Sequence, residues 1–464
     1  MKQSLALIGN NLAILVAATE IAEKGIPVTL FTDGKLLGGH FTGIDINGDS
    51  FDIGMVFIEK IESTSNKADI QTYSPFIRND WTRFGSLASK WIEKKTKLVK
   101  IPTPGTLIHK QIVPDYLIAN RLDVFKGQSI NLLSNSLDKK NALHASNKVT
   151  SPEYETLDYL NAAKFNHGAD LHSAFIEPYI HKFTASSSTK FLARYHRAAW
   201  VPLYFPETLL KACSDGKDVN LPEYSFWTTP GGCAGKLIRD IASDLSNNPL
   251  VSVNHSPIVK IEQIKDAWTI NTNDSILSTR QIALGLTGNR ACELLGLSFE
   301  EPKNFIPVDI LFAMVKTSSL NKSLPPCIMI VDEDYASYRL VNQDALAGLS
   351  PMWSRITIEA NPNTVLKTYP DIDIKNSLEL EIRRLLGNSN LMLENKNIKS
   401  LKHVQIKNAL QLPTYENVEK NKKLNNDIKK TFTNCYLTGN LLGYGVSSLN
   451  DQIIQGIQIS ARHT

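Results

Sequence analysis

The start of the chain constrains the fold more than any other stretch. Residues 4–8 form a continuous apolar run without charge, which predicts a short buried strand. Gly9-Asn10-Asn11 predicts a tight turn, and apolar residues then recur at helical spacing over residues 12–23. Gly25-Ile26-Pro27 ends that helix, and residues 28–31 predict a second strand. Strand, tight turn, helix and strand make a βαβ unit, which places the phosphates of a bound ligand at the helix N-terminus.

Two glycine-containing motifs follow the second strand. The first is Leu36-Leu37-Gly38-Gly39-His40, and the second, after a short β excursion, is Phe51-Asp52-Ile53-Gly54. In this order they resemble the FAD-binding start of the superfamily of amine oxidases, protoporphyrinogen oxidases and UDP-galactopyranose mutases. The resemblance implies an α/β fold. It would contain a Rossmann-like, glutathione-reductase-like FAD/NAD(P)-binding domain, an inserted β-rich substrate domain and a helical subdomain.

The glycine motif of that superfamily is only partly present. Its Gly-x-Gly-x-x-Gly pattern aligns with Gly9, Asn11 and Ile14, so the first glycine alone is retained. The second glycine lets the backbone approach the pyrophosphate, and the third lets helix and strand pack closely. The acidic residue that holds the adenosine ribose aligns with Thr32, and Asp33 follows it. We therefore expect Asn11 to crowd the phosphates, and FAD to be held less tightly than by the full motif.

Two later segments resemble the same superfamily. Residues 226–237, which contain Pro230-Gly231-Gly232, resemble the turn and helix that return to the nucleotide domain. Residues 434–452 resemble the strand, glycine, loop and helix that lie beside the flavin, and the backbone at Ile258 is implied to face the adenine. The cofactor-binding residues implied by the resemblance are Gly9, Asn11, Leu12, Thr32, Asp33, Gly38, Gly39, His40, Ile258, Gly439, Asn440, Gly445 and Val446.

We expect FAD to be bound non-covalently. A covalent link requires a Cys or His beside the isoalloxazine ring. Cys435 lies inside the predicted strand several residues before Gly439, and His40 is the only other candidate.

The resemblance also divides the chain. Residues 1–75, 226–300 and 400–464 are expected to form the FAD-binding domain, 76–225 a mainly helical substrate or cap subdomain, and 301–399 a β-rich substrate domain.

Three residues are candidates for binding the substrate. Arg197 lies in a stretch rich in arginine and aromatic residues, which suits a ligand with a ring and a phosphate or carboxylate. The alternative for this stretch is a helix with core aromatics and solvated arginines. Tyr338 and Arg339 lie on a predicted strand like those that offer Tyr and Arg to ligand phosphates in the mutases. Neighbours on a strand point to opposite faces, so at most one of these two should face the site.

Composition bounds the remaining possibilities. A chain of 464 residues suits two or three domains, and 42% hydrophobic with 21% charged residues is typical of a globular protein. A net charge of +4, with the basic residues spread out, gives little support for a nucleic-acid partner. Five scattered cysteines without CxxC spacing predict reduced thiols, a cytoplasmic location and no metal site. We also expect no signal peptide and no integral membrane segment.

Two classes of function remain open. In the first, the protein is an FAD-dependent oxidoreductase acting on a small organic or sugar-related substrate, or a redox-neutral mutase of the UDP-galactopyranose mutase type. In the second, it is a flavin-free relative that acts as a non-catalytic binding partner, which would explain the eroded glycines. The colour of the purified protein discriminates between them. The sequence names neither the substrate nor the oligomeric state.

Overall fold

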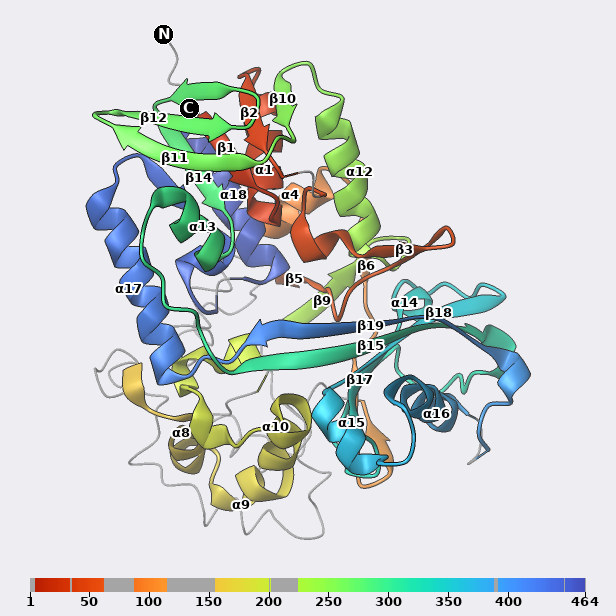
Figure 1. Cartoon of the computed structure of the whole chain (residues 1–464). Helices are drawn as coiled ribbons and strands as arrows, with labels where there is room; N and C mark the ends of the chain where they lie inside the picture. The colour runs from red at the N-terminus through yellow and green to blue at the C-terminus, as the bar shows by residue number, and fades with distance from the viewer. Residues whose placement is uncertain are drawn as a thin grey trace.

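The computed structural model describes residues 5–33, 36–61, 87–114, 155–199, 201, 224–387, 391–445 and 447–463 (Figure 1). In Figure 1 the segments nearest the two termini lie together in the upper half of the molecule. Two long strands, β15 (Phe305–Lys316) and β19 (Ile398–Gln411), cross the middle, and small helices lie below them on the left. The upper half therefore contains the predicted nucleotide-binding fold, and the long strands β15 and β19 lie directly below it.

The upper half is built on a parallel five-stranded sheet of order β10-β2-β1-β14-β20. Its first elements are β1 (Leu5–Gly9), α1 (Leu12–Glu23) and β2 (Val28–Phe31), which confirms the predicted βαβ unit. The other strands are β10 (Val251–Asn254), β14 (Gln281–Gly285) and β20 (Cys435–Leu437).

Alternation along β1 gives each face of this sheet its own core. Leu5 and Leu7 pack with apolar residues of α1, α12 (Ala234–Ser246) and α18 (Leu449–His463). Ala6 and Ile8 belong to the core on the opposite face. That core also takes residues from α13 (Gly288–Leu295), α17 (Tyr415–Thr431) and the antiparallel sheet of β11 (Ile258–Ile264), β12 (Ala267–Thr272) and β13 (Ile276–Thr279).

A seven-stranded sheet of order β19-β15-β18-β17-β16-β7-β8 forms the substrate-side layer. The strand predicted to carry Tyr338 and Arg339 is confirmed as β17, which pairs with β16 and β18. Residues 105–113 form a hairpin, because His109 and Lys110 adopt positive φ and turn the chain. The other members are β7 (Gly105–Ile108), β8 (Gln111–Val113), β16 (Cys327–Ile330), β17 (Ser337–Asn342) and β18 (Trp353–Ala360).

The strand pairing places two segments differently from the expected division of the chain. β19 pairs with β15 along its length, although residues 400–411 were expected in the FAD-binding domain. β7 pairs with β16, although residues 105–113 were expected in the helical subdomain. The β-rich layer therefore recruits strands from both flanking regions, because backbone pairing between strands distant in sequence decides membership of a sheet.

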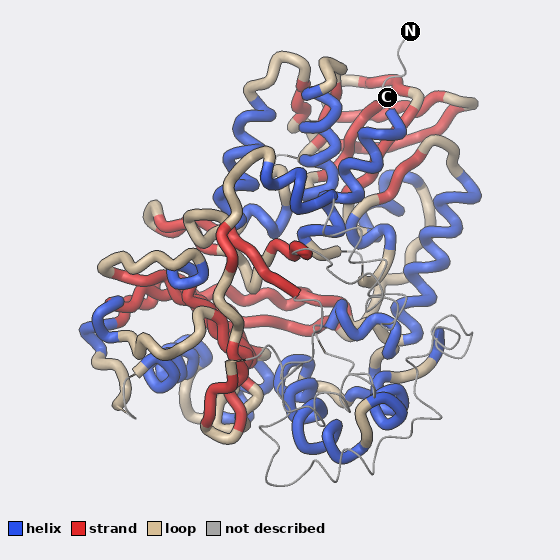
Figure 2. The backbone as a smooth tube through the Cα atoms, turned by 180° about the vertical axis from the view of Figure 1, so that it is seen from behind, coloured by secondary structure: helices blue, strands red, loops and turns tan. Residues whose placement is uncertain are grey.

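Helices cover both faces of the seven-stranded sheet. One face packs on α15 (Pro362–Thr368) and α16 (Ile374–Leu386), and the other on the helical subdomain. Figure 2, from behind, shows the upper nucleotide-binding half above the sheet and the small helices. The helical subdomain contains α8 (Tyr159–Asn166), α9 (Ala169–Leu171), η5 (His172–Ile176), α10 (Glu177–Thr184), η6 (Ser188–Lys190) and η7 (Ala193–Ala199).

Short elements join the two halves. The first glycine motif forms η1 (Gly39–Thr42), and the second follows the hairpin of β3 (Ile44–Ile46) and β4 (Asp49–Phe51). A small sheet of order β5-β9-β6 lies between the halves. It consists of β5 (Ile58–Ile61), β9 (Tyr224–Thr228) and β6 (Val99–Lys100), near α4 (Ser89–Glu93), while α14 (Gln343–Leu346) follows β17 and η10 (Gly439–Leu442) follows β20.

Candidate dinucleotide site

A Rossmann-like fold binds a dinucleotide where the carboxyl ends of its central strands meet the N-terminus of its first helix. In this chain that place lies at the ends of β1, β14 and β20 and the start of α1. Gly9, the retained glycine, has φ of 115°, and a Cβ there would lie 2.3 Å from the carbonyl oxygen of Gly285. The close approach of β1 to β14 therefore requires glycine at this position. The geometry around this glycine is that expected from the superfamily.

Asn11, at the second glycine position, fills the turn with its own side chain. It is the N-cap of α1 with φ of −70°, so it does not supply the left-handed backbone that Asn tolerates. Its Oδ1 accepts a hydrogen bond from the main-chain N–H of Ile14 at 3.1 Å, and its Nδ2 donates to Thr438 Oγ1 at 2.9 Å. Asn11 thus accepts from one of the N–H groups of the helix N-terminus that have no partner within the helix.

Gln452 accepts a hydrogen bond from a second N–H group at the start of α1. From the first turns of α18, its Oε1 accepts a hydrogen bond from the main-chain N–H of Leu12 at 3.0 Å. One helical turn later, Gln455 Oε1 accepts from the N–H of Gly439 at 2.8 Å. Both glutamines are buried, as is Thr438. Asn11 and Gln452 therefore accept from main-chain N–H groups of α1 where an anionic pyrophosphate would be expected. Gln455 accepts from Gly439, in the segment expected beside the flavin.

The main-chain groups expected to face the adenosine of FAD also form hydrogen bonds within the protein. The N–H of Ile258 donates to Asp33 Oδ1 at 3.4 Å, and the carbonyl of Ile258 accepts from Arg290 Nη2 at 2.6 Å. Both main-chain groups implied to face the adenine thus have side-chain partners. Thr32, at the position of the ribose-binding acid, is buried and lies 2.9 Å from His255 Nδ1 through its hydroxyl.

The two glycines after β2 adopt backbone conformations that other residues avoid. Gly38 has φ of 107°, and a Cβ there would come within 2.3 Å of a methyl carbon of Ile238. Gly39 has φ of 61° and lies over the backbone of Asn11. His40 follows in η1, is exposed, and packs its ring against Phe41 at a centroid distance of 3.9 Å. This turn closes over the start of α1.

The C-terminal candidates lie on the other side of Asn11. Gly439 has φ of 58°, and a Cβ there would lie 2.7 Å from Asn11 Nδ2. Asn440 is exposed and accepts a hydrogen bond from Ser447 Oγ at 3.0 Å. Gly445 has φ of 73°, and Val446 lies outside the described residues. Burial raises the pKa of the Cys435 thiol to about 12, so Cys435 is not a thiolate at neutral pH.

The residues present therefore do not fit FAD in this arrangement. The N–H groups of Leu12 and Ile14, and both main-chain groups of Ile258, are bonded to side chains of the chain itself. FAD could use them only by breaking these bonds. The sequence predicted that Asn11 crowds the phosphates, but it did not predict Gln452, Gln455, Thr438, His255 or Arg290. The sequence carries no clear signal for them, because the buried face of α18 also contains Asn450, Asp451 and Ser460, so Gln452 and Gln455 do not stand out.

The second glycine motif has a structural role. Asp52 is buried and accepts hydrogen bonds from the N–H groups of Ala234 and Gly235, at 3.1 and 2.7 Å, which cap the start of α12. Burial raises the pKa of Asp52, although these hydrogen bonds oppose the shift. Arg355 in β18 pairs with Asp344 and donates to the carbonyls of Ser50 and Gly231, both at 2.6 Å. These contacts join the seven-stranded sheet to the nucleotide-binding half.

Arg339 forms a buried ion pair, and its role in binding a substrate stays a prediction. Its Nε and Nη2 donate to the two carboxylate oxygens of Glu359 at 2.7 and 2.6 Å. Tyr338 donates its hydroxyl to the same carboxylate at 3.1 Å. The expectation that Tyr338 and Arg339 point to opposite faces is corrected, because the register between β17 and β18 shifts between Ser337 and Arg339. Arg197 lies in η7, and its side chain is outside the described residues.

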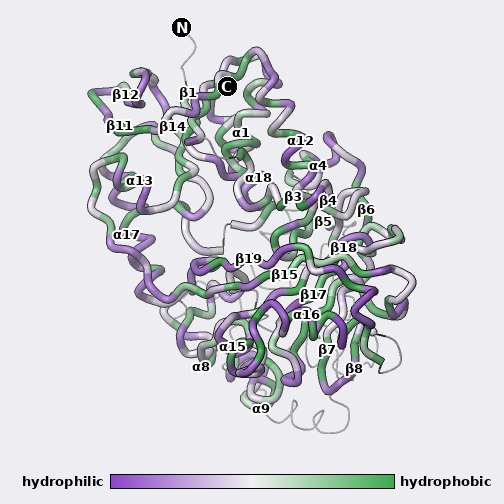
Figure 3. Tube along the Cα trace, turned by 45° about the vertical axis from the view of Figure 1, so that its right-hand side comes forward, coloured by the Kyte–Doolittle hydropathy of each residue, from purple (hydrophilic) through white to green (hydrophobic). Residues whose placement is uncertain are grey.

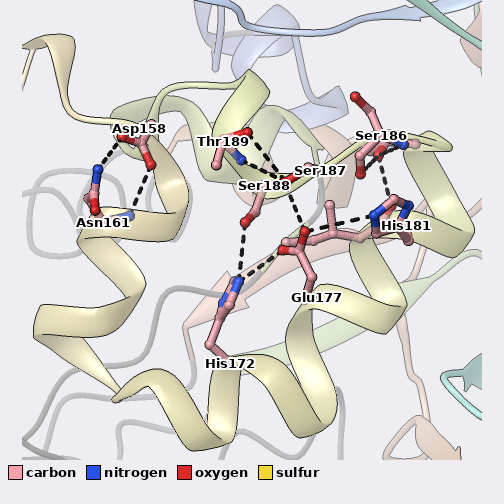
Figure 4. A network of polar contacts seen from close by, with 11 residues as sticks. Asp158, Asn161, His172, Glu177, His181, Ser186, Ser187, Ser188 and Thr189 are labelled. Carbon is pink, nitrogen blue, oxygen red and sulfur yellow. Dashed lines mark hydrogen bonds and ion pairs between the residues drawn. The ribbon is translucent and has the colours of Figure 1, made fainter.

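The helical subdomain holds a separate polar network (Figure 4). The Nε2 of His172 lies 2.9 Å from Glu177 Oε2 and 3.1 Å from Ser188 Oγ. A Ser-His-acid triad places serine and acid on opposite ring nitrogens, whereas here both face the same one. Within the described ranges, no three His, Cys, Asp or Glu side chains gather as they would around a metal ion. The same part of the chain contains no helix with the length and apolar character that a bilayer span needs.

Comparisons with known proteins agree with this architecture. No family model and no curated protein sequence matches the chain. Among solved structures, a reduced UDP-galactopyranose mutase is similar with a TM-score of 0.69 and 14% identity, over 100% of this chain and 94% of that one. A protein described as a protoporphyrinogen oxidase from Exiguobacterium sp. is similar with a TM-score of 0.64 and 14% identity, over 100% and 99%.

Cyclohexylamine oxidase from Brevibacterium oxydans is also similar, with a TM-score of 0.57 and 10% identity, over 100% and 99% of the two chains. The chain therefore has the fold shared by amine oxidases, protoporphyrinogen oxidase and UDP-galactopyranose mutase. The resemblance seen in the sequence is confirmed at the level of the fold.

Proposed function

We propose that this protein is a flavin-free relative of the flavoenzymes that share its fold, and that it acts by binding a ligand rather than by transferring hydride. One observation carries the proposal: four main-chain groups that a dinucleotide would use, at Leu12, Ile14 and Ile258, are bonded to side chains of the chain itself. Gln452 and Asn11 accept from the start of α1, and Asp33 and Arg290 occupy both groups of Ile258.

Energetics support this reading. A net protein hydrogen bond contributes about 1 kcal/mol, but a buried polar group left without a partner costs about 1–3 kcal/mol. FAD would have to displace Gln452 and Asn11 from α1, and their carboxamides would then need new partners in a buried site. Nothing comparable opposes FAD in a glycine turn that has no side chain. The internal bonds therefore disfavour FAD by several separate contributions.

The second candidate is an FAD-dependent oxidoreductase, or a redox-neutral mutase, with non-covalent FAD and a small-molecule substrate. It is favoured by Gly9, Gly38, Gly39 and Gly439, which keep the positive φ values and close approaches described above. FAD thus remains a prediction of the resemblance, and the two candidates differ in one measurable property.

The test is the flavin content of the protein purified from cells supplied with riboflavin. The protein is denatured, and the released flavin is quantified by fluorescence against the protein concentration. We expect far less than one flavin per chain. A near-stoichiometric yield of FAD would overturn the proposal and establish the second candidate. A flavoenzyme purified in parallel controls for loss of flavin during purification.

A further inference from the structure

A cavity of about 390 Å³ lies between α17, η7 and the loop that follows η10. Tyr195 and Tyr444 contribute rings, Asn421, Asn425 and Asn426 contribute carboxamides, and Lys429 contributes a positive charge. Figure 3 shows α17 largely in the colours of hydrophilic residues. The volume falls within the range of small-molecule sites, but the lining is more polar than is usual for them. A polar lining of this kind suits a ligand that is itself rich in hydrogen-bonding groups.

Two buried polar atoms of this lining have no partner. The hydroxyl oxygen of Tyr444 and Oδ1 of Asn425 are both inaccessible to solvent and form no hydrogen bond with the described residues. Asn425 is held in place through its other amide atom, since Nδ2 donates to the carbonyl of Leu441 at 2.9 Å. Buried polar groups are rarely left unpaired in folded proteins, so each such atom requires an explanation. Because neither atom is accessible to solvent, a ligand satisfies them only when the two side chains turn towards the cavity, and it then supplies one acceptor and one donor.

The hydroxyl of Tyr444 is a hydrogen-bond donor. Burial raises the pKa of Tyr444, with a smaller contribution from Tyr195, so its hydroxyl remains protonated at neutral pH. The two tyrosine rings lie 5.8 Å apart at an interplanar angle of 58°. This arrangement gives the cavity an aromatic wall next to a hydrogen-bond donor.

The cavity is lined by two lysines, and they differ in whether they form an ion pair. Lys422 pairs with Glu419 at 3.0 Å and lies 3.6 Å from Glu155. Lys429 is exposed and forms no ion pair with any residue that the structure describes. An ammonium group at the rim of a polar cavity favours a ligand with a carboxylate or phosphate.

We infer that this cavity binds a small polyhydroxylated molecule that carries an anionic group, the chemistry of an acidic or phosphorylated sugar. Carboxamides match sugar hydroxyls because each offers both donors and an acceptor. The inference deepens the proposed function by naming a class of ligand. The inference rests on the proposed function only for the role of the bound ligand, because the cavity lies outside the dinucleotide site.

The test measures binding by isothermal titration calorimetry with glucuronate, glucose 6-phosphate, glucose and inorganic phosphate as probes. We expect one of the two anionic sugars to bind at least about tenfold more tightly than both glucose and inorganic phosphate, as a charge-assisted hydrogen bond predicts. Lys429→Gln should remove this preference, whereas Lys430→Gln, at the exposed neighbour outside the cavity, should change the affinity less than about twofold.

Tyr444→Phe separates binding from folding. It removes a buried hydroxyl that has no partner in the free protein, so the melting temperature should stay the same or rise while binding of the anionic sugar weakens about tenfold. The inference is overturned if none of the probes binds, if inorganic phosphate binds as well as the sugars, or if Lys430→Gln weakens binding as much as Lys429→Gln. The two proposals are tested by different measurements. Absence of sugar binding says nothing about the flavin content, and a protein that contains flavin is still able to bind the sugar in this cavity.

Discussion

The side-chain carbonyl of Gln452 accepts a hydrogen bond from the main-chain N–H of Leu12 at 3.0 Å, although 440 positions separate the two residues. This contact ties the first helix of the chain to the last, with the amide dipole of Gln452 at the positive end of α1. The same end of a helix is where a Rossmann-like fold binds pyrophosphate. A neutral amide of the protein therefore accepts a hydrogen bond from a main-chain group that a dinucleotide would use.

Asn11→Gly tests the second part of this arrangement. Glycine is itself a fair N-cap, so losing the cap costs a few tenths of a kcal/mol, and losing the bond to Thr438 adds about 1 kcal/mol. We expect a folded protein that is about 1–2 kcal/mol less stable in urea unfolding and takes up more FAD than the wild type. If uptake is unchanged or lower, Asn11 does not block the phosphates, and the predicted crowding is wrong.

The ion pair of Arg339 and Glu359 predicts a strong effect on stability. Both side chains are buried, so Arg339→Met leaves an unpaired carboxylate in the interior and should cost about 3–5 kcal/mol in the free energy of unfolding. The double variant Arg339→Met/Glu359→Leu should recover part of that loss, because an apolar pair replaces both charges. The recovery is incomplete because the buried hydroxyl of Tyr338 loses its acceptor, which costs about 1–3 kcal/mol.

The exposed pair of Lys236 and Asp240 supplies the control, since Lys236→Met should cost less than about 1 kcal/mol. A melting temperature of Arg339→Met close to that of the wild type would show that the ion pair is not structural. The predicted role of Arg339 in binding a substrate would then be the better explanation of its position.

Glu177 predicts a loss of stability in acid. Burial alone would raise its pKa, but hydrogen bonds from His172 and Ser188 outweigh it and lower the pKa from 4.5 to about 2. A carboxylate with a lowered pKa stabilises the folded state above its unfolded pKa, and the stabilisation disappears as the pH falls from 4.5 towards 2. The difference in unfolding free energy between wild type and Glu177→Gln should therefore reach at most about 3 kcal/mol near neutral pH.

Urea unfolding at about pH 7 and about pH 3 measures this difference, which should be smaller at the lower pH. Asp170→Asn, at an exposed carboxylate of α9 outside the network, is the control for a carboxylate replaced by its amide. A pH-independent difference for Glu177→Gln would mean that the network in Figure 4 does not depend on an ionised Glu177.

The sequence predicted elements whose pattern is local. The βαβ unit and the strand at 337–342 follow from apolar periodicity and glycine positions, and the structure contains both. β19 was missed as part of the substrate-side sheet, since its lysine-rich pattern is that of a partly exposed strand and its partner β15 lies about a hundred residues earlier. The internal bonds of the dinucleotide site were also beyond prediction, because they join side chains such as Gln452 to a helix start at the other end of the chain.

The most direct measurement is a fluorescence titration of FAD into the wild type and Gln452→Ala, both purified without flavin. Removing the carboxamide frees the N–H of Leu12 without touching the glycines. The account predicts no saturable binding to the wild type and binding at micromolar or lower concentration to Gln452→Ala, or to Gln452→Ala combined with Asn11→Gly. Tight FAD binding by the wild type, with no gain in either variant, would contradict it.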